Sequence, residues 1–154
     1  MGGSFVFSDF ASDIALNHSI ILARELSLIY LPPMNRWAMI GSTLAFFSVV
    51  LGAFGAHALK AHLDEKSLAI YHTATEYQMY HALALIGLGL WSAQNPTFST
   101  ELTGWAFTGG CVIFSGSLYL LAITRISLLG AITPIGGVLF LVGWFSFGQL
   151  MWKS

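Results

Sequence analysis

Six side chains that ionise or donate hydrogen bonds lie beside or within long apolar runs of this 154-residue chain. An ionisable group near the middle of a bilayer costs about 2.5–3.5 kcal/mol on insertion scales, so such groups usually face inward and pair. A set of paired groups either holds helices together or forms a proton or small-ligand site, and we favour the first interpretation because such bonds are common between membrane helices. The six residues of this candidate polar cluster are His57, Glu76, Tyr77, His81, Tyr119 and Arg125.

Metal and haem ligation are further chemistries that histidines can serve. His72 and Glu76 are four residues apart and share a helix face, but protein metal sites usually have three or four protein ligands. A haem between His57 and His81 suits the geometry of a helical bundle, yet these histidines belong to no cofactor motif. We therefore expect no metal and no cofactor.

Covalent catalysis has no recognisable signature in the sequence. Ser115 and Ser117 lie in an apolar run without an obvious base or an oxyanion turn. The glycine-rich stretches lack the Lys-Ser or Lys-Thr pair that follows a phosphate-binding loop. The sequence therefore predicts no enzymatic activity and no catalytic residue.

Composition indicates the solvent that surrounds these side chains. Hydrophobic residues make up 56% of the chain and charged residues only 8%, against about 25% charged in an ordinary soluble domain. Four apolar runs lack the period-two alternation of barrel strands and suit helices that cross about 30 Å of hydrocarbon. The predicted fold is an all-α integral membrane four-helix bundle, with helices at about 37–59, 77–92, 102–124 and 126–152.

The second of these runs is short for a membrane crossing, which needs about 20 residues. Its helix can begin earlier, near Ser67, and enter the bilayer at Tyr77. Four crossings place the connection at 93–100 on the side of the chain termini, and the connections at 60–76 and Arg125 on the other side. The candidate polar cluster is therefore expected at one depth, on that second side.

Helical spacing predicts partners within the cluster. Tyr77 and His81 are four residues apart and share a face, whereas Glu76 lies about 100° from Tyr77 around the helix. We therefore expect His81 to meet His57 between the first two helices. Glu76 is then expected to reach Arg125 or an interfacial lysine.

Residues 1–33 differ from the rest of the chain. Charged residues are scattered among apolar ones there, and Pro32-Pro33 separates the stretch from the first apolar run. This extension is either a helix that lies on the membrane surface or not part of the native protein, in which case translation starts at Met34. The predicted domains are the extension, 1–33, and a transmembrane domain, 34–154.

Four ordered motifs carry a family resemblance: GAFGAH at 52–57, YQMYHALA at 77–84, FSGSLYLL at 114–121 and GAITPIGG at 130–137. In these motifs the chain resembles the YgdD-like family of small bacterial inner-membrane proteins, which has relatives in animals. The resemblance covers residues 34–151. It implies a four-helix membrane protein, located in the inner membrane if the chain is bacterial, and it brings no activity, substrate or catalytic residue.

The sequence thus favours a small structural or accessory membrane protein of unknown biochemical function, which acts through a membrane-protein partner or as a homo-oligomer. The alternative is a small oligomeric transporter or channel that uses the polar cluster at one membrane side. Transporters usually show repeated halves with broken helices, and only Pro134 hints at such a break. A net charge of −1 without a basic run gives no support to nucleic-acid binding.

The break at Pro32-Pro33 leads to a first prediction. A chain that starts at Met34 is expected to insert into the membrane and to remain monodisperse in detergent, because every apolar run is retained. Size-exclusion chromatography of the extracted protein, beside the full-length chain, tests this. Loss of insertion or aggregation of the short chain alone would contradict it.

Overall fold

A computed structural model describes residues 16–22 and 35–153. The chain divides into two compact units, Met1–Pro33 and Met34–Ser154. In the first unit, residues 16–22 are helical and exposed. The remainder of the predicted interfacial helix lies outside the described residues, so that hypothesis stays a prediction.

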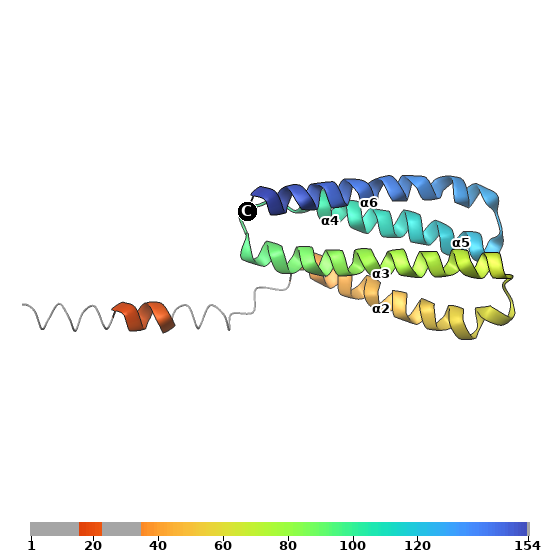
Figure 1. Ribbon diagram of the computed structural model, residues 1–154, viewed down its shortest axis with the longest axis horizontal. Coiled ribbons are helices and arrows are strands. Elements are labelled where there is room, and N and C mark those ends of the chain that lie inside the picture. Colours follow the sequence, from red (N-terminus) through yellow and green to blue (C-terminus); the bar gives the residue numbers. More distant parts are fainter. Residues whose placement is uncertain (1–15, 23–34, 154) are drawn as a thin grey trace, which may run out of the picture. The chain divides into compact units, whose positions relative to one another are not determined.

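The second unit is entirely helical in its regular structure, which confirms the all-α class (Figure 1). Two short segments, a 3₁₀ turn (η1) and a π-helical stretch (η2), accompany the α-helices. In chain order the elements are α2 Arg36–His57, η1 Leu59–Ala61, α3 Glu65–Gln94, α4 Glu101–Gly110, η2 Cys111–Ser115, α5 Gly116–Thr124 and α6 Ser127–Lys153.

The predicted count of four spanning helices is met only in part. Five α-helices are present among the described residues, because the π-helical stretch divides the third predicted helix into α4 and α5. Helical structure continues through this stretch. Three helical segments are long and apolar enough to cross a membrane, namely Arg36–Ala61, Glu101–Thr124 and Ser127–Lys153.

The second predicted helix, 77–92, needs the largest correction. α3 begins at Glu65, close to the earlier start that the sequence allows, and is 30 residues long. Its N-terminus is set by Asp64, whose side chain accepts a hydrogen bond of 2.8 Å from the backbone N–H of Ser67. The twelve additional residues add about 18 Å of helix, so residues predicted near the start of this helix lie deep within it.

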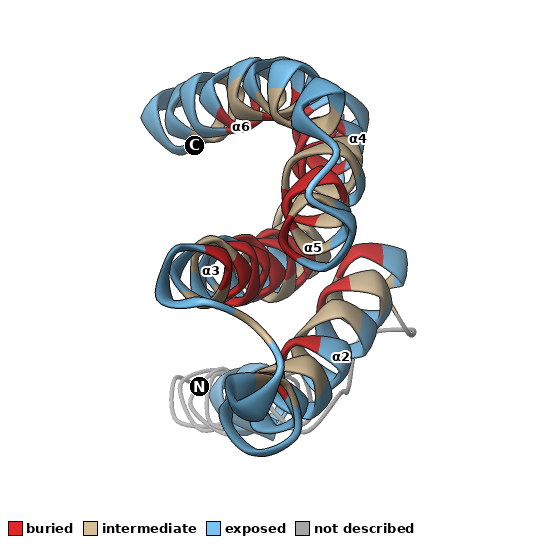
Figure 2. Ribbon diagram, turned by 90° about the vertical axis from the view of Figure 1, so that its right-hand side faces the viewer, coloured by how far each residue is buried: buried red, intermediate tan, exposed pale blue. Residues whose placement is uncertain are grey.

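α3 is the core helix of the second unit. Eleven of its residues are buried, against four in α2 and three in α6. α2 packs on α3, α3 packs on the continuous α4–η2–α5 helix, and α6 packs on that helix as well. In Figure 2, α2 and α6 lie at the two ends of a staggered row of helices, and the buried residues gather mainly on α3 and the α4–η2–α5 helix between them.

Glycines let α2 and α3 approach closely. A Cβ atom added to Gly41 would lie 2.6 Å from the carbonyl oxygen of Ala82, and one added to Gly89 would lie 2.6 Å from the backbone nitrogen of Ala38. These distances are far shorter than a carbon atom tolerates, so both positions require glycine. The two backbones therefore pack with no side chain between them, as small residues permit in membranes.

At the end where α2 begins, side chains join the start of α2 to the end of α3 and to the start of α4. The Nε1–H group of Trp37 donates to Thr100 Oγ1 at 2.9 Å, and Arg36 forms an ion pair with Glu101. The Asn35 amide donates to Ser92 Oγ at 2.6 Å. Since Trp37 is 1% exposed, this aromatic anchor is part of the core.

The close approach of α2 and α3 gives a second prediction. Gly41→Ala is expected to lower the free energy of unfolding by about 1–3 kcal/mol, because the added methyl group must push the Ala82 and Ile86 backbone away. Gly87→Ala is the matched control, since a Cβ there has no neighbour within 4 Å. Thermal unfolding in detergent, followed by circular dichroism, measures both, and equal midpoints would contradict the packing argument.

Candidate functional site

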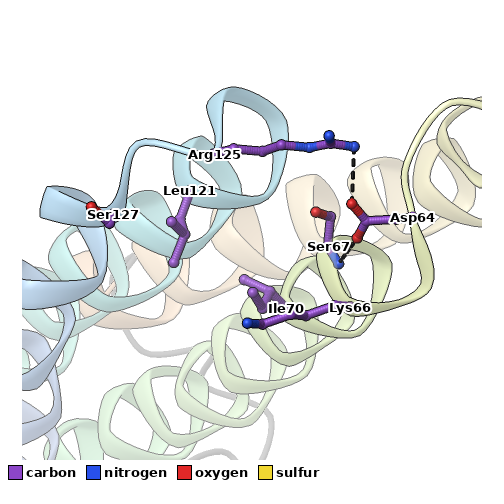
Figure 3. Close-up of a pocket in the computed structure, with 7 residues that line it drawn as sticks. All are labelled: Asp64, Lys66, Ser67, Ile70, Leu121, Arg125 and Ser127. Atoms are coloured by element: carbon purple, nitrogen blue, oxygen red, sulfur yellow. Dashed lines mark hydrogen bonds and ion pairs between the residues drawn. The ribbon is translucent and has the colours of Figure 1, made fainter.

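A pocket of about 390 Å³ lies where three helices end or begin (Figure 3). It is formed by the first turns of α3, the last turn of α5 and the first residue of α6. Charged side chains and two apolar ones, Ile70 and Leu121, line it. The full lining is Asp64, Lys66, Ser67, Ile70, Leu121, Arg125 and Ser127.

An ion pair joins two of the residues that line this pocket. Arg125 Nη2 lies 3.0 Å from Asp64 Oδ2, and both side chains are half exposed. The hydrogen bond from the backbone N–H of Ser67 is the main cause that holds the pKa of the Asp64 carboxyl below 3.8, with Arg125 and Lys66 lowering it further. Exposed pairs of this kind add little stability, so the pair orients the turn more than it stabilises it.

Arg125 presents this charge from a left-handed backbone conformation. Its φ of 60° ends α5 and turns the chain into α6 within two residues. The expected partner Glu76 is exposed on α3, and within residues 16–22 and 35–153 it makes no ion pair. Asp64 replaces it because the acid next to the turn lies at the depth of Arg125, whereas Glu76 lies three turns into α3.

The expected pairing of His57 with His81 is also wrong. His57 is an exposed residue at the end of α2. Ala82, adjacent to His81, packs on Gly41, which precedes His57 by 16 residues, or about 24 Å of helix rise. The early start of α3 accounts for this separation, because it moves His81 from the membrane surface toward the middle of the bundle.

His81 instead connects α3 to α6. Its Nδ1 atom lies 2.7 Å from the carbonyl oxygen of Tyr77, and Trp144 Nε1–H donates to His81 Nε2 at 3.1 Å. A carbonyl only accepts and an indole only donates, so these bonds specify the neutral imidazole with its proton on Nδ1. The ring stacks on Phe140 with centroids 3.4 Å apart.

Tyr119 meets a residue that the predicted cluster did not include. The Tyr119 hydroxyl donates to Gln78 Oε1 at 3.0 Å, and Gln78 Nε2 donates to the carbonyl oxygen of Leu44 at 2.8 Å. Gln78 is buried and thereby joins α2, α3 and α5. The sequence does contain a signal for it, because Tyr71, Gln78 and Leu85 recur every seven residues on one face of the helix.

Further polar pairs cross the helix interfaces. Thr103 Oγ1 lies 2.7 Å from Ser146 Oγ, and Ser117 Oγ lies 2.8 Å from Thr133 Oγ1. The Ser48 hydroxyl donates to the carbonyl oxygen of Thr75 at 2.8 Å. These short, neutral bonds are suited to fixing helices against one another.

The placement of the His, Cys, Asp and Glu side chains bears on metal binding. Over residues 16–22 and 35–153, no group of three or more His, Cys, Asp or Glu side chains is placed to hold a metal ion. Cys111 is free and buried. The expectation of a chain without metal or cofactor stays a prediction.

Apolar helices of membrane-spanning length, joined by polar pairs, define a helical multi-pass membrane protein. The chain belongs to the family described as "Protein of unknown function (DUF423)", whose model matches residues 51–137. It is 48% identical over 111 residues to a UPF0382 membrane protein of Staphylococcus epidermidis, a match that covers 72% of this chain and 90% of the relative.

Two further relatives support the same assignment. A UPF0382 membrane protein of Staphylococcus saprophyticus is 48% identical over 111 residues, 72% of this chain and 92% of the relative. The UPF0382 membrane protein YwdK of Bacillus subtilis is 44% identical over 112 residues, 72% of this chain and 91% of the relative. No solved structure matches the chain.

The Asp64–Arg125 turn yields a third prediction. The pKa of Asp64 is lower in the folded chain than its ordinary 3.8, so its stabilising contribution is present above that pH and is lost as the pH falls through the folded value. Asp64→Asn is expected to lower the thermal midpoint at about pH 7, with the difference from wild type shrinking toward about pH 3. A difference that stays constant with pH contradicts this, and Glu65→Gln in the same turn is the control.

Proposed function

We propose that this chain is a structural or accessory membrane protein without catalytic activity of its own, which acts through another membrane protein. One observation supports this most strongly. Among the described residues, Ser115 Oγ is the single buried side-chain nitrogen or oxygen atom without a hydrogen-bond partner. The buried polar groups are thus engaged in holding helices together, and few are left for chemistry.

We further propose that α3 is a fourth membrane crossing, in keeping with the YgdD-like resemblance. Its 30 residues reach about 45 Å, more than the roughly 30 Å of hydrocarbon. Its polar residues lower its mean hydropathy, but Thr75, Gln78 and His81 are buried against other helices. Hydropathy is a property of composition, whereas compatibility with lipid depends on which side chains face outward.

Interaction with a partner is supported by the outer surface. α2 and α6 carry large exposed apolar side chains, among them Phe46 at 63%, Leu141 at 70% and Phe145 at 71% exposure. Lipid can cover such a surface, and so can the helix of another membrane protein or of a second copy. A partner within the membrane suits this surface better than a soluble protein does, because the exposed faces of α2 and α6 are apolar.

A transporter or channel is the weaker candidate. Transport folds usually place substrate sites at broken helices, and α6 continues as a helix through Pro134. In the end pocket, the Asp64 and Arg125 charges are engaged with each other in an ion pair (Figure 3). These features favour a fixed bundle over a conducting one.

A double-mutant cycle tests the structural role. Gln78→Leu and Tyr119→Phe each remove one end of the hydrogen bond between these side chains, and we expect both to lower stability in detergent, with a coupling of about 0.5–1.5 kcal/mol. Gln149→Leu, an exposed glutamine on α6, is the matched control and should have little effect.

The opposite result is equally clear. The gene deletion can be complemented with each variant. If Gln78→Leu and Tyr119→Phe leave the unfolding midpoint unchanged but fail to restore the wild-type cellular phenotype, these residues form a functional site. The structural role would then be refuted, and transport assays in proteoliposomes would follow.

A further inference from the structure

A groove of about 410 Å³ lies between α3 and α6, distinct from the end pocket. Both helices pack on the α4–η2–α5 helix, and in Figure 2 α6 lies above α3 with α4 and α5 to their right. α6 contributes residues at helical spacing, including Gly137, Phe140 and Trp144, and α3 contributes Tyr77, Tyr80 and His81.

The groove lies at the depth of the membrane centre. Phe140 is the central residue of the 27-residue helix α6, which is apolar and long enough to span a membrane. His81 stacks on Phe140 and bonds to Trp144, and both stacked rings are buried, so they lie beneath the groove at that depth. The groove therefore faces hydrocarbon rather than water.

Polar groups at this depth distinguish the groove from an ordinary lipid-facing surface. Tyr77 and Tyr80 are 40% and 55% exposed. Among the described residues, no hydrogen-bond partner of either hydroxyl is present. An unpaired hydroxyl in hydrocarbon is costly. Each of these two hydroxyls can therefore donate a hydrogen bond to an acceptor that reaches the groove through the lipid.

Size and shape narrow the class of ligand. Small-molecule sites are typically hollows of about 300–1,000 Å³ with aromatic walls and a few polar groups, and they occur between the helices of bundles. Gly137 leaves open space on the α6 side, since an added Cβ there has no neighbour closer than 3.9 Å. An acyl chain would fill the groove but leave both hydroxyls unpaired, whereas a ring with carbonyl oxygens satisfies them.

We propose that this groove binds a lipid-soluble molecule whose flat ring carries carbonyl acceptors, an alkylated benzoquinone being the simplest example. The ring lies against the Trp144 side chain, which lines the groove and is 47% exposed, and its carbonyl oxygens accept from Tyr77 and Tyr80. The alkyl tail extends into the bilayer. The proposal concerns binding only and is independent of the structural role proposed above.

The test uses the full chain in phosphatidylcholine nanodiscs with decylubiquinone as the probe. Saturable quenching of tryptophan fluorescence is expected, because Trp144 lines the groove. Gly137→Leu is expected to abolish the saturable component by filling the groove. Gly116→Leu is the matched control, because a Cβ at Gly116 also has open space but lies outside the groove. Tyr80→Phe should raise the Kd about five- to tenfold through loss of one hydrogen bond.

Several results would overturn the proposal. These are the absence of saturable quenching in the wild type, equal affinities of Gly137→Leu and Gly116→Leu, and displacement of the quinone by an equal concentration of decane. A wild-type dimer that Gly137→Leu converts to a monomer would assign the groove to a second copy instead. If Gly137→Leu is not monodisperse, Tyr80→Phe decides, and an unchanged Kd then refutes the proposal.

Discussion

Hydrocarbon supplies no hydrogen bonds, so each polar side chain within a membrane protein must find its partner inside the molecule. This constraint explains the central place of α3. The helix carries Thr75, Gln78 and His81 in its middle turns, and all three are buried. Gln78 reaches both a backbone carbonyl of α2 and the hydroxyl of Tyr119 on α5. The most polar of the long helices therefore lies between α2 and the α4–η2–α5 helix, and its neighbours present apolar faces outward.

Close packing follows from the same arrangement. Polar side chains form short bonds between helices only if the backbones approach closely, and glycine permits this at the α2–α3 interface through Gly41 and Gly89. At the opposite interface, Phe140 of α6 stacks on His81. Small residues on one side of α3 and aromatic rings on the other thus create two different helix interfaces. The α2–α3 interface is a close backbone contact, whereas the α3–α6 interface leaves room for a groove.

The end pocket and the groove differ in the same way. At the end of the helices, the Asp64–Arg125 pair lies where water and headgroups screen charge, so it organises a turn at little cost. At mid-depth no charged side chain lines the groove, and its polar side-chain groups are two hydroxyls, an imidazole and an indole N–H. Charge at the surface and neutral donors at the centre are what the bilayer allows.

The sequence by itself determined the class of the protein, because helix formation and membrane compatibility are read from continuous apolar runs. Observed α2 and α6 lie within two residues of the predicted 37–59 and 126–152. Only the tertiary structure decided which polar residues meet. The partners of His81 and Arg125 depend on how far each helix extends and how it is rotated. A start at Glu65 rather than 77 moved His81 away from His57, and a capping hydrogen bond, which hydropathy does not register, set that start.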